Sequence, residues 1–217
     1  MPFTDSKKIE IIYNQILYKN MEHINTNFVK SLVESGKITS DPYILQIGEI
    51  IEWKRPLDLA FASNLLPKNI QVLFVGDGDK ELIKKITRLS KKCICLGPVY
   101  GSDRNGLIVN SKLVCVSSLR EPFGLTLLEA GTLGVPSIVR PSGSLPEIII
   151  DGYNGFIAKN LSIKAYSNAI NLGLSNKTKL TDKLLSEYTI DTFSPKNTTY
   201  KMVDLANQIL ANNNKPE

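Results

Sequence analysis

Short, nearly continuous apolar runs recur along this chain and alternate with longer segments whose apolar residues have helical spacing. Apolar runs that end in Gly or a polar residue are typical of parallel strands buried on both faces. The alternation predicts an α/β fold with a doubly wound parallel sheet and right-handed crossovers. The expected strands are 43–48, 71–76, 93–97, 112–116 and 136–139, and the helical segments between them are 56–66, 80–89 and 124–133.

The two ends of the chain depart from this repeating pattern. Residues 7–14 predict one more strand, which a polar stretch separates from a helix at 27–35. Near the other end, 161–172 and 200–210 predict two amphipathic helices joined by a polar segment. The tail from residue 212 is expected to be frayed.

Composition excludes several classes of protein. With 42% hydrophobic and 22% charged residues over 217 positions, the chain is neither a disordered acidic tail, nor collagen-like, nor a polytopic membrane protein. The net charge of +5 suits an anionic ligand, although lysines that serve solubility explain it more simply. No basic stripe is interleaved with aromatic residues, so nucleic acid is not an expected partner.

The cysteines and the single histidine argue against disulfides and metal. Cys93, Cys95 and Cys115 fall within apolar runs and are expected to be buried thiols in a reducing compartment. His23 has no Cys or His cluster near it, which predicts a surface residue and no structural metal. A polar N-terminus and the lack of an apolar stretch of ~20 residues make the cytoplasm the expected location.

The predicted topology also indicates where a ligand would bind. In doubly wound sheets, ligands bind outside the carboxyl ends of the strands, in the loops that lead into the helices. In this chain those loops are 48–54, 76–80, 96–105 and 117–123, and the last strand leads into 140–144.

The loop after the fourth of these strands carries the clearest chemical signal. Glu121 lies in this loop, and Gly124 precedes a helix expected to begin near Leu125. The free amides of a helix N-terminus form an anion site, and carboxylates such as Glu121 and Glu129 accept hydrogen bonds from hydroxyls. Such a pair beside a phosphate could bind a sugar on one side and a ribose on the other. The simpler interpretation is one charge near a helix N-terminus and one solvated charge.

The sequence around these glutamates resembles a known enzyme family. The patterns E-P-F-G-L-T-x-x-E-A, then G-V-P, then G-S-L-P-E-I-I-x-D-G-x-N-G-F fall within 117–156. They resemble the C-terminal, donor-binding half of the family 4 (group 1) glycosyltransferases, retaining enzymes with the two Rossmann-like domains of GT-B architecture. The E-x7-E motif of that family matches Glu121 and Glu129. The resemblance implies a hexosyltransferase, of a type that often acts in polysaccharide biosynthesis.

The resemblance extends to the loop at 48–54, which is similar to the G-R-x-x-x-x-K loop of the family. Lys54 matches the lysine that binds the donor diphosphate. Glu49 stands where the family has arginine, which removes one positive charge, and Arg55 could compensate for it. The turn at 75–78 is similar to the V-G-D-G turn of the family. The segment at 96–99, which includes Val99, is similar to the L-G-x-V segment that lines the base pocket.

The resemblance assigns a role to each matching residue. Glu121 would contact the donor sugar and Lys54 would neutralise the diphosphate leaving group, and these two are the expected catalytic residues. Backbone amides from 123 to 126 would bind sugar and phosphate, and Glu129 would bind the ribose. The substrate would be a nucleoside diphosphate sugar, and the chemistry electrostatic, with no cofactor or metal. The expected donor-binding residues are Gly48, Arg55, Val99, Phe123, Gly124, Leu125, Thr126 and Glu129.

The resemblance spans about residues 8–210 but only one of the two domains of the family. It divides the chain into an N-terminal linker strand and helix at 1–42, a nucleotide-sugar-binding domain at 43–192, and a crossover helix with a frayed tail at 193–217. An acceptor domain would then come from a separate chain, or the chain would self-associate, with peripheral contact at the inner membrane face as a further option. Apolar residues that would face the absent domain are expected to be exposed, namely Ile12, Ile16 and Leu17.

Three interpretations remain open. The chain could be the donor half of an enzyme whose other half is a separate chain, or a fragment of a complete transferase. It could also be a non-catalytic nucleotide-sugar-binding or interaction module.

Overall fold

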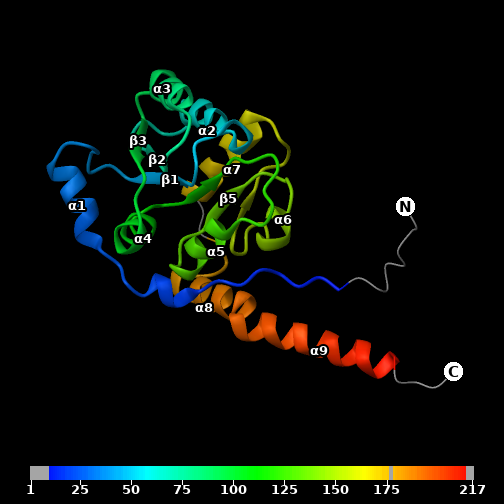
Figure 1. Cartoon of the computed structure of the whole chain (residues 1–217). Helices are drawn as coiled ribbons and strands as arrows, with labels where there is room; N and C mark the ends of the chain where they lie inside the picture. Colours follow the sequence, from blue (N-terminus) through cyan, green and yellow to red (C-terminus); the bar gives the residue numbers. More distant parts are fainter. Residues whose placement is uncertain (1–9, 176–177, 214–217) are drawn as a thin grey trace.

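A six-stranded parallel sheet lies at the centre of the computed structural model, which describes residues 10–175 and 178–213 (Figure 1). Its strand order is β3-β2-β1-β4-β5-β6, so the chain reverses direction across the sheet between β1 and β4. This order and the parallel pairing confirm the predicted doubly wound α/β fold. The strands are β1 (Tyr43–Ile47), β2 (Gln71–Val75), β3 (Cys93–Gly97), β4 (Val114–Val116), β5 (Ser137–Val139) and β6 (Gly155–Ile157).

Helices connect these strands and cover both faces of the sheet (Figure 1). Local sequence starts several of them: Asp79 caps α3 by accepting hydrogen bonds from two amides of its first turn, and Pro56 occupies the first turn of α2. The α-helices are α1 (Thr26–Glu34), α2 (Pro56–Ser63), α3 (Lys80–Leu89), α4 (Gly101–Val109), α5 (Leu125–Thr132), α6 (Leu145–Ile148), α7 (Ile163–Ser175), α8 (Asp182–Phe193) and α9 (Pro195–Asn213), and the 3-10 helices are η2 (Tyr18–Met21) and η3 (Glu52–Lys54).

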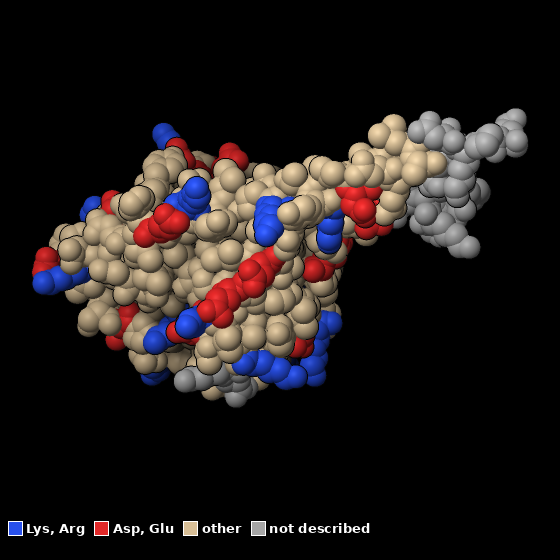
Figure 2. Space-filling model, turned by 90° about the horizontal axis from the view of Figure 1, so that it is seen from below, with Lys and Arg blue, Asp and Glu red and all other residues tan. Residues whose placement is uncertain are grey.

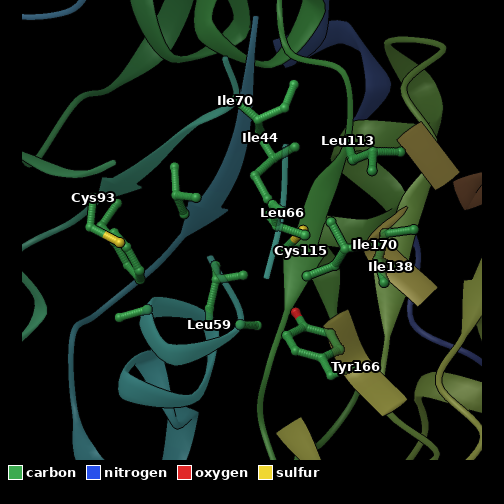
Figure 3. Close-up of a cluster of buried hydrophobic side chains, with 14 of the residues drawn as sticks. Ile44, Leu59, Leu66, Ile70, Cys93, Leu113, Cys115, Ile138, Tyr166 and Ile170 are labelled. Carbon is green, nitrogen blue, oxygen red and sulfur yellow. The ribbon is translucent and has the colours of Figure 1, made fainter. Parts of the chain in front are cut away.

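The core divides into layers because successive strand residues point to opposite faces. Ile44 belongs to the layer beneath α2, α3 and α7, whereas its neighbour Leu45 belongs to the layer beneath α1, α4 and α5. Figure 3 shows the first layer, where Leu59 of α2 and Tyr166 and Ile170 of α7 lie among strand side chains. Burial on both faces explains why these strands appear as continuous apolar runs.

The predicted elements at the chain ends are partly wrong. Residues 10–14 form no strand, while 7–9 lie outside the described residues. The segment expected to be a polar connection contains α8, whose buried Leu185, Thr189 and Phe193 recur at helical spacing. The helix predicted at 200–210 is longer and begins at Pro195, and the tail expected to be frayed lies mostly outside the described residues.

The N-terminal segment packs against the domain instead of adding a strand. The amide of Ile16 donates to the Phe193 carbonyl oxygen at 2.9 Å, and the Tyr13 ring lies 6.1 Å from the ring centroids of both Phe123 and Phe193. The prediction that Ile16 is exposed is therefore wrong, since only 6% of it is accessible. Leu17 is exposed as predicted, at 57%, and Ile12 is half-buried.

Helix α9 extends away from the rest of the domain (Figure 1). It follows α8 after a break at Ser194, which has extended dihedral angles and precedes Pro195. Its large apolar side chains are mostly accessible, and they are Tyr200, Met202, Val203, Ile209 and Leu210.

The surface charge is mixed. Figure 2 shows a face on which basic and acidic side chains are interspersed. His23 is exposed, as predicted. Among the described helices, none combines the length and the apolar character that crossing a bilayer requires.

The cysteines yield a first testable prediction. Burial raises the pKa of Cys95 to about 11 and also raises the pKa values of Cys93 and Cys115. The thiolate is the reactive form, so at pH 8 the folded chain should react with Ellman's reagent roughly a hundredfold more slowly than the urea-unfolded chain. Reactivity should rise as the pH approaches 11. Rapid labelling of one thiol in native buffer at pH 8 would contradict this packing.

Candidate functional site

A narrow pocket lies where the strand order reverses, between the carboxyl ends of the neighbouring strands β1 and β4. This is the place where doubly wound sheets bind ligands. The pocket brings together three of the residues expected at the site: Lys54 from η3, Glu121 from the loop after β4 and Thr126 from the first turn of α5. Its wall consists of Gln46, Ile47, Lys54, Cys115, Val116, Ser117, Ser118, Glu121, Gly124 and Thr126.

Lys54 places a cation in this pocket. A Cβ atom added to Gly48 would lie 2.7 Å from the Lys54 ammonium, so the amine lies directly over the glycine that follows β1. The ammonium also lies 5.3 Å from the centre of the Trp53 ring. Among the described residues, no carboxylate lies within ion-pair distance of it. The Lys54 cation is therefore available to an anionic ligand.

The N-terminus of α5 forms another wall of the pocket. Gly124 caps the helix with φ +92°, and its carbonyl oxygen accepts from the Leu127 amide at 2.9 Å. The amides of Leu125 and Thr126 precede this first helical hydrogen bond, and such groups attract anions. Positive potential from Lys54 and from the helix end thus converges on one pocket.

Hydrogen bonds from the loop after β5 hold the loop that carries Glu121. Ser144 donates to the Glu121 carbonyl oxygen from its amide at 3.3 Å and from its hydroxyl at 3.2 Å. The Ser142 hydroxyl donates to the carbonyl oxygen of Leu119. The predicted loop at 140–144 therefore supports the site through hydrogen bonds to the backbone of the Glu121 loop.

A second hollow of about 440 Å³ adjoins the first, and Ile47 lines both. It contains Gly48 and Val99, which were predicted, together with the exposed Glu49. The turn after β2 lies close to the backbone of Gly48. A Cβ atom added to Gly76 in this turn would overlap the Gly48 carbonyl oxygen. The residues that line the hollow are Ile47, Gly48, Glu49, Val75, Gly76, Asp77, Gly78, Pro98, Val99, Tyr100 and Arg104.

Arg104 was not predicted from the sequence. Its guanidinium donates to Glu129 at 2.7 Å, and both side chains are mostly buried, with 23% and 16% exposed. Glu129 was expected to bind a ribose, and the pairing places an arginine beside that carboxylate. A loop was expected at 96–105, because α4 begins with Gly-Ser-Asp, and Arg104 on the first turn of this helix was therefore overlooked.

Four predicted residues line neither hollow: Glu129, which pairs with Arg104, and Arg55, Phe123 and Leu125. Arg55 donates through its guanidinium to Asp58 at 3.1 and 3.2 Å. Phe123 packs against Tyr13 and Phe193, and Leu125 is half-exposed. Arg55 and Phe123 therefore border the site through contacts with other protein residues.

A buried ion pair lies beneath the first pocket. Arg140 follows β5, is fully buried, and donates to Asp58 of α2 at 2.6 Å and to the Ser117 carbonyl oxygen at 3.4 Å. Its guanidinium lies 5.0 Å from the centre of the Tyr166 ring. This contact could not be predicted, because a lone arginine after a strand usually faces solvent.

A larger hollow of about 660 Å³ lies at the opposite ends of α4 and α5, near Val109 and Leu133. It is mostly apolar, and neither Lys54 nor Glu121 reaches it. The predicted chemistry therefore belongs to the strand-end hollows.

Comparison with protein families gives one match. The model described as "Glycosyl transferases group 1" matches residues 29–190. That span contains β1 to β6 and both strand-end hollows.

Curated proteins with related sequences cover similar parts of the chain. N-acetyl-alpha-D-glucosaminyl L-malate synthase of Bacillus anthracis is 29% identical over 161 residues, which are 71% of this chain and 41% of that protein. UDP-Gal:alpha-D-GlcNAc-diphosphoundecaprenol alpha-1,3-galactosyltransferase of Escherichia coli is 27% identical over 180 residues, 77% of this chain and 46% of the enzyme. The chain therefore spans less than half the length of these relatives.

Solved structures share the fold. Anabaena HepE in complex with UDP and glucose superposes with a TM-score of 0.78 at 22% identity, over 95% of this chain and 59% of that one. Sucrose-phosphate synthase from Thermosynechococcus elongatus gives a TM-score of 0.75 at 21% identity, over 93% and 53%.

Proposed function

The chain belongs to the group 1 glycosyl transferase family, and from this premise we propose that it is the donor-binding domain of a retaining family 4 hexosyltransferase. Its Rossmann-like sheet matches one half of GT-B transferase structures. The observation that carries the proposal is the convergence of Lys54, Glu121 and the α5 N-terminus on one pocket. We propose that the substrate is a nucleoside diphosphate sugar, which would lie across this pocket and the adjoining hollow.

Each part of such a donor has a matching part of the site. The diphosphate would lie between the Lys54 ammonium and the amides at the start of α5, with its sugar hydroxyls toward Glu121. The nucleoside would occupy the adjoining hollow, with Val99 against the base. Glu129 does not line this hollow and would approach the ribose from beside Arg104, which does. The fold neighbour HepE was crystallised with UDP and with UDP-glucose, which makes uridine nucleotides the first to test.

The chemistry follows from charge development. When the bond between the sugar and the diphosphate breaks, negative charge grows on the departing diphosphate oxygen. Lys54 and the oriented helix amides would stabilise this charge without reorganising, which is the kind of contribution that usually dominates in enzymes. Glu121 would hold the sugar in place. We therefore propose catalysis that needs no metal or cofactor.

The charge of Glu49 differs from the pattern that the resemblance to family 4 glycosyltransferases implies for the loop after β1. Glu49 removes a positive charge from the loop after β1, and Arg104 brings one to the same hollow from α4. Both arginines are paired with a carboxylate, but Arg104 lines the same hollow as Glu49, whereas Arg55 lines neither hollow. We expect Arg104 to offset part of the charge that Glu49 introduces.

We propose that the acceptor is held by structure beyond these 217 residues, on another part of the same protein or on another chain. The support is that the chain spans 41% and 46% of two transferase relatives. The apolar side chains of α9 and the exposed Leu17 are the surfaces we propose for that partner, for self-association or for peripheral contact at the inner membrane face.

A binding titration tests the donor site. The purified chain is titrated by calorimetry with UDP, GDP, ADP and their sugar conjugates, with and without EDTA. One nucleotide should bind, and EDTA should leave its affinity unchanged. Because each substitution removes a charge-assisted contact, Lys54→Ala and Glu129→Ala should each weaken binding by roughly ten- to a hundredfold.

Two controls make the titration decisive. Lys30→Ala removes an exposed lysine of α1 and should bind like the wild type. Urea unfolding of Glu129→Ala checks that the loss of the Arg104 partner leaves the fold intact. Failure of every nucleotide to bind at millimolar concentration would overturn the donor-site proposal and favour a non-catalytic interaction module.

A further inference from the structure

The fully buried Arg140 connects two elements that form the candidate pocket. Its Nη1 atom donates to Asp58 of α2 at 2.6 Å and to the carbonyl oxygen of Ser117, which follows β4, at 3.4 Å. Arg140 lies beneath the pocket and lines neither hollow. Any effect of Arg140 on a ligand must therefore pass through the residues that it holds.

The contacts of Arg140 form a closed ring that includes the backbone of Lys54. Asp58 accepts from the Arg55 guanidinium at 3.1 and 3.2 Å. Arg55 follows Lys54 directly, and the Lys54 carbonyl oxygen lies 2.8 Å from the Ser117 hydroxyl. The Ser117 carbonyl oxygen accepts from Arg140, which completes the ring.

The backbone inside this ring has an unusual conformation. Among the described residues other than glycine, Arg55 alone has a positive φ, at 53°. A left-handed conformation is unfavourable for a residue with a Cβ atom and persists where surrounding contacts impose it. The Asp58 carboxylate accepts from the Arg55 side chain and is itself fixed by Arg140. The ring thus holds the turn that ends η3 and thereby sets the direction in which the Lys54 side chain leaves the backbone.

Two features distinguish this arrangement from an ordinary stabilising pair. The Nε and Nη2 atoms of Arg140 are buried and have no hydrogen-bond partner among the described residues. Buried charges with unpaired donors are poor sources of stability, and apolar residues often replace such pairs without loss. Both acceptors are contacted by the Nη1 atom at the very end of the arginine side chain, a position that the shorter lysine side chain and apolar side chains do not supply.

We propose that Arg140 is a positioning residue that fixes the backbone of residues 54–58 and thereby keeps the Lys54 ammonium over Gly48 in the pocket. The part of this inference that concerns a diphosphate rests on the proposed function. The part that concerns the backbone does not.

The test uses Arg140→Lys in the full chain, with Tyr166→Phe as a matched control. Lysine keeps the positive charge but ends one bond short of the Nη1 position, whereas Tyr166→Phe removes a buried hydroxyl from the aromatic ring that lies beside Arg140 and keeps the guanidinium contacts. The first readout is amide hydrogen exchange at Lys54 and Arg55, whose amides donate to Ile51 and Glu52 at 3.2 and 3.0 Å. Exchange at both should rise about tenfold in Arg140→Lys, with the β2 amides unchanged.

The second readout is binding of whichever of UDP, GDP or ADP binds the wild-type chain, together with the matching nucleoside. Arg140→Lys should weaken the diphosphate about tenfold and leave the nucleoside unchanged, and this loss should vanish in a Lys54→Ala background, since the two residues act as a unit. Tyr166→Phe should match the wild type in both readouts.

The outcomes separate the two proposals. Unchanged exchange at Lys54 and Arg55, exchange that rises equally throughout the sheet, or a binding loss that persists in the Lys54→Ala background would overturn the positioning role. If no nucleotide binds the wild-type chain, the proposed function fails, and hydrogen exchange still decides whether Arg140 fixes residues 54–58.

Discussion

An Asp58→Leu variant should lose about 3–5 kcal/mol of unfolding free energy, because it leaves the Arg140 guanidinium buried without its anion. Asp58 is buried, Arg140 is fully inaccessible, and the two lie 2.6 Å apart. The desolvation cost of Arg140 then has no compensation from a charge partner. Urea unfolding monitored by circular dichroism measures the loss.

The double variant Asp58→Leu with Arg140→Met is the matched control. It removes both charges and should recover most of the lost stability, because an apolar pair of similar size is tolerated at such sites. A loss below about 1 kcal/mol in the single variant would mean that water or another group solvates Arg140, contrary to this packing.

A Gly76→Ala variant should lose about 2–5 kcal/mol and close part of the hollow proposed for the nucleoside. Gly76 has φ +152°, a conformation essentially restricted to glycine, and a Cβ there would overlap the Gly48 carbonyl oxygen. The carboxyl ends of β1 and β2 would have to separate, and Gly48 is the residue over which the Lys54 amine lies.

Gly36→Ala serves as the control for this variant. Gly36 also has a positive φ, +69°, but a Cβ there would meet nothing within 4 Å. It should cost about 1–2 kcal/mol, from backbone strain alone. Equal losses in the two variants would show that the contact between the ends of β1 and β2 does not matter for stability. Unfolding in urea compares the two losses.

The sheet could be predicted because its strands are buried on both faces. Runs such as 43–48 and 71–76 are apolar without alternation, and the structure places Ile44 and Leu45 in different core layers. Strand β6 was missed although it is as long as β4 and β5, because Gly155–Ile157 begins with glycine and follows the turn-forming residues of 151–154. Strand order depends on packing between distant segments, which local patterns do not record.

Helices that bury polar side chains were harder to predict than the strands. In α8, Thr189 occupies the middle of the buried stripe between Leu185 and Phe193, which weakens the apolar periodicity. In α4, Asn105 is buried because its side-chain amide donates to the backbone carbonyl oxygens of Asn20 and His23. Both helices satisfy or bury polar groups through tertiary contacts, so their sequences look like loops.

The candidate site could be predicted where its residues closely follow the carboxyl ends of neighbouring strands. Glu121, Gly124 and Thr126 follow one strand, and Lys54 follows its neighbour, so the topology brings them together. Arg104 and Arg140 could not be found in this way. Each has its acidic partner on a distant element, Glu129 on α5 and Asp58 on α2, and neither pair has a characteristic spacing.

The aromatic contact between Tyr13, Phe123 and Phe193 has a consequence for how this domain folds. It joins residues near both ends of the described chain to the loop that carries Glu121, and the Ile16 amide bonds to the Phe193 carbonyl oxygen at the same place. Contacts so distant in sequence close a long loop, and their entropic cost delays them in folding. During synthesis, β1 to β3 can pair early, whereas the Glu121 loop gains its aromatic support only after Phe193 has left the ribosome. The candidate pocket is therefore among the last parts of the domain to mature.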